Sequence, residues 1–92
     1  AREPRDDGRT LMQVLYFAWL RERVGAGREE IASDAPTVAA LVEELRAKDE
    51  RYALAFADLS AVRVAVDQEA AEFDAPLAGV RELAFFPPVT GG

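Results

Sequence analysis

The sequence predicts a single α+β domain in which one main helix packs against a mixed β-sheet. Two strand-like segments precede the clearest helical segment, and two or three further strands follow it. The chain has 92 residues, half of them hydrophobic, which is enough for one small core without disulfides or metals. No internal repeat or low-complexity stretch interrupts the order of these segments.

The first predicted element is a hairpin that follows a charged N-terminal stretch. Residues 1–10 carry no apolar side chain larger than alanine, so we expect residues 1–11 to form a flexible extension. Met12–Ala18 is rich in β-branched, aromatic and long apolar residues, which predicts a central strand buried on much of both faces. The chain then turns over residues 19–27, which contain two glycines, and residues 28–32 return as a second strand.

The clearest signal in the chain is that of the main helix. Apolar residues recur at positions i, i+3, i+4 and i+7, namely Val38, Leu41, Val42 and Leu45. Thr37 precedes them and is predicted as the N-cap. Glu44 is placed to pair with Lys48 on the exposed face. The Ala and Leu content of residues 50–57 predicts a second, short helix.

The last part of the chain predicts the remaining strands. Val62–Val66 places three valines on one face of a strand, and Asp67-Gln68 is predicted as a turn into a short returning strand over residues 69–72. Residues 73–79 are predicted as a loop anchored by two apolar side chains, Phe73 and Leu77.

Residues 80–86 are predicted as the last strand. Side chains alternate between the two faces of a strand, so Phe85 and Phe86 must point in opposite directions. We expect Phe85 to lie in the core and Phe86 to lie outside it.

The sequence then ends in a stiff segment and two glycines. Pro87 and Pro88 fix φ and have no backbone N–H, so residues 87–92 are expected to leave the domain as an extended tail. Gly91 and Gly92 have no side chains, so this tail could lie in a narrow channel with its carboxylate accessible to the catalytic groups of a second protein.

The composition excludes several classes of function. There is no cysteine and no histidine, which removes the thiol nucleophile, the usual general base and the commonest metal ligands. The formal charge of −6 argues against binding to a phosphate backbone. No apolar run is long enough to span a bilayer and no signal peptide is recognised, so we expect a cytoplasmic protein that binds neither nucleic acid nor membrane.

The chain resembles the small sulfur-carrier subunits of molybdopterin synthase, which are ubiquitin-like β-grasp proteins. The resemblance covers about residues 12–92. It depends most on four motifs: VLYFAWLRERVG at 14–25, APTV at 35–38 with Leu41, VDQ at 66–68 and AFFPPVTGG at 84–92. It implies a β-grasp domain over residues 12–86 with four to five strands, followed by the diglycine tail. One departure is the segment before the last strand, where the family has Gly-Asp-Glu and this chain has Val80-Arg81-Glu82, with the glycine one residue earlier at Gly79.

The resemblance also implies a chemistry for the tail. An ATP-dependent activating enzyme of the ubiquitin-activating type would adenylate Gly92, and a sulfur donor would convert it to a thiocarboxylate. The tail, with Gly91 and Gly92 at its end, would then donate sulfur to a cyclic pterin precursor to build the dithiolene of molybdopterin. The chain would bind no cofactor itself and would be a non-catalytic subunit. A large subunit would supply the catalytic side chains, in a heterotetramer with two small subunits at opposite ends of a large-subunit dimer.

Matching positions in the family imply a partner-binding surface. Its members are Phe17, Arg21, Ala70 and Phe86, together with the tail residues Pro87, Pro88, Val89 and Thr90. The alternative is that Phe17 and Phe86 are core residues, because large apolar side chains are mostly buried. Arg21 could equally be an ordinary solvated charge.

Two other functional classes remain open. A diglycine carrier could serve another pathway, such as formation of the thiamine thiazole, or could be a modifier conjugated to lysines. The chain could also be an interaction module in which the diglycine has no role.

Overall fold

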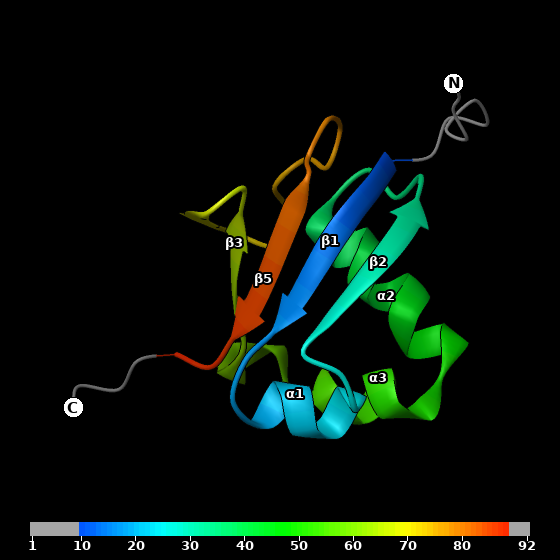
Figure 1. The fold of residues 1–92 in the computed structure, drawn as a ribbon, viewed down its shortest axis with the longest axis vertical. Helices are drawn as coiled ribbons and strands as arrows, with labels where there is room; N and C mark the ends of the chain where they lie inside the picture. The colour runs from blue at the N-terminus through cyan, green and yellow to red at the C-terminus, as the bar shows by residue number, and fades with distance from the viewer. Residues whose placement is uncertain (1–9, 89–92) are drawn as a thin grey trace.

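The computed structural model describes residues 10–88, which form one five-stranded sheet with its helices (Figure 1). The elements are β1 (Thr10–Tyr16), α1 (Trp19–Val24), β2 (Arg28–Ser33), α2 (Val38–Lys48), α3 (Glu50–Ala55), the 3₁₀ helix η2 (Leu59–Ala61), β3 (Arg63–Val66), β4 (Glu69–Ala71) and β5 (Glu82–Phe86). The sheet order is β2-β1-β5-β3-β4, with β1 and β5 parallel and the other neighbours antiparallel. The predicted mixed sheet with one main helix, a β-grasp arrangement, is confirmed.

β1 is an interior strand of the sheet, paired with β2 on one side and β5 on the other, but it starts and ends earlier than the sequence indicated. Its antiparallel ladder with β2 begins at the pair Thr10↔Ser33, two residues before the predicted start at Met12. The strand ends at Tyr16, because Ala18 has a φ of 54° and turns the chain away from the sheet. The two strand boundaries are therefore set by the partner strand and by the turn.

The two faces of β1 differ in burial. Met12, Val14 and Tyr16 point into the core, whereas Leu11 is 45% exposed. The prediction that this strand is buried on much of both faces is therefore wrong. The helices cover only one face of the sheet, so the apolar side chains at alternate positions of β1 remain accessible on the other face.

The loop predicted between the first two strands contains a helix instead, α1. It has only six residues, and Leu20 and Val24, four positions apart, are its buried residues. No side chain caps its N-terminus, so the sequence carries no start signal. Gly25 ends it with a φ of 91°, the left-handed conformation in which glycine is favoured.

α2 confirms the predicted main helix. The Thr37 hydroxyl accepts a hydrogen bond from the Ala40 N–H at 3.2 Å, as an N-cap does, and the four predicted apolar residues are buried. Glu44 does not pair with Lys48; its Oε1 instead accepts a hydrogen bond of 2.8 Å from the buried Ser33 hydroxyl. α3 confirms the second helix, which ends at Ala55, two residues before the predicted end.

The loop before β5 accommodates the sequence Val80-Arg81-Glu82. Asp67 and Gln68 have φ values of 49° and 73°, as a two-residue hairpin turn of type I′ requires, which confirms the predicted turn. The Asp67 carboxylate accepts hydrogen bonds of 3.0 Å from the N–H groups of Arg81 and Glu82. Gly79 has a φ of 78°, so the glycine in its shifted position provides the left-handed residue of this loop.

The core is centred on Phe85 of β5. Its side chain is fully buried, with its ring centroid 4.9 Å from that of Phe56 in an edge-to-face arrangement and 6.2 Å from that of Tyr16. Phe86, the next residue, is only partly buried. The prediction that Phe85 points inward and Phe86 outward is confirmed.

Candidate functional site

The candidate site is the face of the sheet that the helices leave open, at the end where β5 leads into the tail. Cross-strand partners point to the same face of a sheet, and the register pairs Leu15 with Ala84, Ala84 with Ala65 and Ala65 with Ala70. These four residues form an apolar row across β1, β5, β3 and β4, which we call the open-face row.

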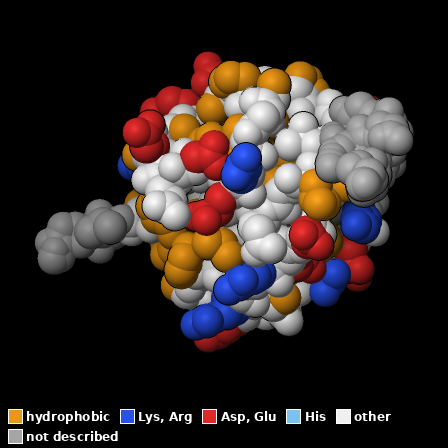
Figure 2. Space-filling view, turned by 45° about the horizontal axis from the view of Figure 1, so that its top comes forward, with side chains coloured by type: hydrophobic (Ala, Val, Ile, Leu, Met, Phe, Trp, Pro, Cys, Tyr) orange, Lys and Arg blue, Asp and Glu red, His pale blue; other side chains and the backbone are white. Residues whose placement is uncertain are grey.

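Phe17 and Phe86 lie beside this row, two residues further along the chain than Leu15 and Ala84. The Phe17 N–H donates a hydrogen bond to the Phe85 carbonyl at 3.1 Å, which extends the parallel ladder by one residue and places Phe17 beside Phe86. Phe17 is 47% exposed, so it is not the core residue that the alternative interpretation expected. Figure 2 shows hydrophobic side chains gathered next to the point where the described chain ends, with basic side chains beside them.

The structure places the other predicted partner residues at the two sides of this pair. Arg21 is exposed on α1, and its side-chain stem lies over Gly27. A β-carbon added at Gly27 would lie only 3.1 Å from Arg21 Cδ. Ala70 is exposed on β4, two strands away from Phe86, which corresponds to about 10 Å across a sheet. Ala70 and Phe86 therefore lie on the same sheet without being neighbours, and Arg21 lies on α1 beside Gly27.

Sequence reasoning missed the residues that connect these positions. Leu15, Ala65 and Ala84 fill the surface between Phe17 and Ala70. Leu15 and Ala65 alternate with buried residues on β1 and β3, whereas Ala84 is itself buried on β5, with a relative exposure of 8%. The alternation was visible in the sequence, but the pairing of strands was not. Pro87 and Pro88 are partly buried after β5. The remaining predicted tail residues, Val89, Thr90, Gly91 and Gly92, lie outside the described residues.

Within residues 10–88 no group of three or more acidic, His or Cys side chains is arranged to hold a metal ion. The part of the chain that the structure describes also has no helix of the length and apolar character needed to cross a membrane.

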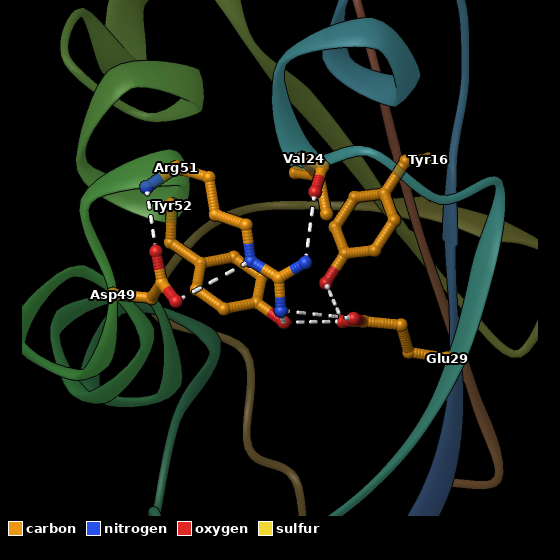
Figure 3. Close-up of polar contacts among 6 residues, drawn as sticks. All are labelled: Tyr16, Val24, Glu29, Asp49, Arg51 and Tyr52. Atoms are coloured by element: carbon orange, nitrogen blue, oxygen red, sulfur yellow. Dashed lines mark hydrogen bonds and ion pairs between the residues drawn. The ribbon is translucent and has the colours of Figure 1, made fainter.

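A polar cluster beneath α1 and α3 fixes the helices to the sheet (Figure 3). Glu29 Oε1 accepts hydrogen bonds from the Tyr52 hydroxyl at 2.6 Å and from the Tyr16 hydroxyl at 3.1 Å. Arg51 lies 3.7 Å from Glu29 Oε2, and its Nη1 donates a hydrogen bond of 3.2 Å to the Val24 carbonyl at the end of α1. One carboxylate and one guanidinium therefore connect β1, β2, α1 and α3.

Burial raises the pKa of both tyrosines, and the Glu29 carboxylate raises it further because a tyrosinate beside it would be a second negative charge. The pKa of Tyr52 rises to about 12. Both hydroxyls therefore remain protonated donors to Glu29 throughout the neutral pH range.

We expect the folded protein to lose stability at alkaline pH through Tyr52. Unfolded tyrosine has a pKa of about 10, so between pH 10 and 12 the unfolded chain releases this proton while the folded chain keeps it. The free energy of unfolding should therefore fall by up to about 1.4 kcal/mol per pH unit above pH 10 through this group. Urea unfolding from pH 8 to 11 should show a steeper fall for the wild type than for Tyr52→Phe, and equal slopes would contradict this assignment.

A family model and two known proteins match nearly the same region of this chain. The model of the ThiS family matches residues 14–92. The molybdopterin synthase sulfur carrier subunit of Escherichia coli K12 is 48% identical over 82 residues, which cover 89% of this chain and all of that protein. The subunit of the same name from Haemophilus influenzae is 35% identical over the same coverage.

A solved structure agrees with the fold. SAMP1 from Haloferax volcanii superposes with a TM-score of 0.68 at 27% identity, covering 90% of this chain and all of that chain. The match therefore includes the sheet, the main helix and the order of the strands. The chain belongs to the ThiS family and, within it, to the molybdopterin synthase sulfur carrier subunits of molybdenum cofactor biosynthesis.

Proposed function

We propose that Gly92 is the residue on which this chain carries sulfur, as a C-terminal thiocarboxylate that is delivered to a cyclic pterin precursor. The observation that supports this most directly is the extent of the matches. The family model runs to residue 92, and the alignment with the Escherichia coli carrier covers that whole protein. The FFPPVTGG ending is therefore part of the shared protein.

The chemistry requires an activated carboxyl group. A carboxylate is a poor electrophile, so a good leaving group must be installed before sulfur can attack. An activating enzyme would transfer AMP from ATP to the Gly92 carboxylate with release of pyrophosphate, and a sulfur donor would then displace AMP. This chain has neither cysteine nor histidine, so the acid, base and thiol groups for both steps would come from partner proteins.

The open face of the sheet is the surface that we assign to the large subunit of the synthase. Phe17 and Phe86 lie side by side where β5 leads into Pro87 and Pro88, so a partner that holds the tail would also cover this pair. Large aromatic side chains at the centre of an interface contribute much of its binding energy. Arg21 lies at the edge of the same surface, and the assembly would be a heterotetramer.

Reconstitution tests this proposal. The purified chain would be loaded with sulfur by an activating enzyme, ATP and a sulfur donor, and then mixed with a large subunit and the cyclic pterin precursor. We expect molybdopterin to form in proportion to the thiocarboxylate supplied. A fully loaded chain that binds an active large subunit but gives no product would contradict the assigned step.

A second candidate is a protein modifier, which the similarity to SAMP1, a small archaeal modifier protein, favours. An isopeptide bond needs an amine acceptor, and Lys48 is the only lysine of this chain. In a Lys48→Arg variant, conjugates formed in cell extract with ATP must therefore be attached to other proteins or to the α-amino group. Isopeptide-linked targets would support the modifier, whereas thiocarboxylate without conjugates would support the carrier alone.

A further inference from the structure

The connection between β1 and α1 contains a residue in an unfavourable backbone conformation. Ala18 has a φ of 54° and a ψ of −133°. The Leu20 N–H donates to the Phe17 carbonyl at 3.1 Å, so residues 17–20 close a turn with Ala18 in its second position. These angles are those of a type II′ turn, in which glycine is strongly favoured at this position.

Ala18 is also unfavourable as the start of a helix. It occupies the N-cap position of α1, where Ser, Thr, Asp or Asn would accept a hydrogen bond from the first turn, and it makes no side-chain cap. Two local preferences are therefore broken at one exposed residue. Such positions persist only where the surrounding structure fixes them, and they are concentrated at functional sites.

The surrounding structure does fix α1. Leu20 and Val24 are fully buried, and at the far end of the helix the Gly25 N–H donates to the Arg21 carbonyl at 2.9 Å. Arg51 Nη1 holds the Val24 carbonyl. Because α1 is held by its buried face and its C-terminus, the unfavourable angles are confined to Ala18.

The residue that this turn controls is Phe17. Its N–H is bonded to Phe85 and its carbonyl to Leu20, while its side chain is 47% exposed beside Phe86. These two hydrogen bonds hold the Phe17 backbone in one orientation, and an alanine at position 18, which has fewer accessible conformations than glycine, opposes opening of the turn that they close.

The geometry points to Ala18 as a positioning residue that pre-orients Phe17 for docking of the large subunit. This inference rests on the proposed function, because the partner is the one assigned to the open face. The strain at Ala18 lowers the stability of the isolated domain, and the rigid turn reduces the entropy that is lost when Phe17 becomes immobilised in the interface. Glycine at position 18 would remove the strain but would also remove the rigidity.

The test is to measure stability and binding together in Ala18→Gly. We expect a melting temperature that lies within about 4 °C of the wild type or above it, because relief of strain offsets the entropy of glycine. We expect affinity for the large subunit to fall about tenfold, because a turn that opens more readily leaves Phe17 in the binding orientation for a smaller fraction of the time. Unchanged affinity would overturn the inference.

A chain made by ligation with D-alanine at position 18 separates rigidity from strain. A D-residue favours positive φ and remains as restricted as alanine, so it should recover the affinity lost in Ala18→Gly and melt above the wild type. Affinity as low as that of the glycine variant would show that rigidity is not the cause. Two negative results have different meanings. If the wild-type chain does not bind the large subunit at all, the proposed function fails. If the wild type and Ala18→Gly bind it equally well, only the inference about Ala18 fails.

Discussion

Replacing Gly92 with alanine is expected to lower sulfur transfer on the order of 100-fold while leaving the melting temperature unchanged. A methyl group at the reacting residue would displace the terminal carboxyl group within the active site of the partner, and a misplacement of about 1 Å can cost a factor of that size. The core residues of the described part of the chain lie between Met12 and Phe85, so we expect the substitution to leave the core intact. Loading with sulfur, transfer to the precursor and thermal unfolding would be measured on the same preparation.

Gly79→Ala is the matched control for this substitution. It makes the same chemical change at a glycine with a φ of 78° in the loop before β5, with no atom within 4 Å of the added carbon. The positive φ alone should lower the free energy of unfolding by roughly 1 kcal/mol. Transfer per folded molecule should stay at the wild-type rate. A comparable loss of stability and of transfer in Gly92→Ala would contradict the assignment of Gly92 as the reacting residue.

Adjacent phenylalanines at the end of β5 should give opposite results when each is changed to alanine. Phe85→Ala should lower the free energy of unfolding by about 3–5 kcal/mol, because its fully buried ring packs against Phe56 and Tyr16. For a domain of this size the melting temperature should fall on the order of 10–40 °C.

Phe86→Ala should have the converse effect. Its side chain is partly exposed, so the loss of stability should be about 1 kcal/mol or less, whereas affinity for the large subunit should fall at least about tenfold. Leu54→Ala is the control, since Leu54 is an apolar side chain on α3 that is 59% exposed and lies outside the open-face row. Calorimetric titration would show the difference, and full affinity in Phe86→Ala would remove Phe86 from the interface.

The parts of the fold that sequence reasoning predicted are those with strong local signals. α2 has a capping threonine and four apolar residues at helical spacing, and Asp67-Gln68 has the residue types of a tight hairpin turn. α1 could not be predicted, because a six-residue helix without a side-chain cap is stabilised by packing of Leu20 and Val24 rather than by its own sequence.

The geometry of the candidate surface could not be predicted from the sequence. Phe85 and Phe86 were assigned to opposite faces from alternation alone, which needs no knowledge of other strands. The open-face row depends on the register between β1, β5, β3 and β4, and register between strands distant in sequence is a tertiary property. The contacts of Glu29 with Tyr16 and Tyr52 likewise join residues far apart in the chain.

Mass spectrometry of the intact chain and of its C-terminal peptide is the most direct measurement of the central claim. After incubation with an activating enzyme, ATP and a sulfur donor, the chain should gain the mass that corresponds to replacing one oxygen by sulfur. Fragmentation should place the sulfur on Gly92. An unchanged mass with partners shown to be active on another carrier, or sulfur on any other residue, would contradict the account.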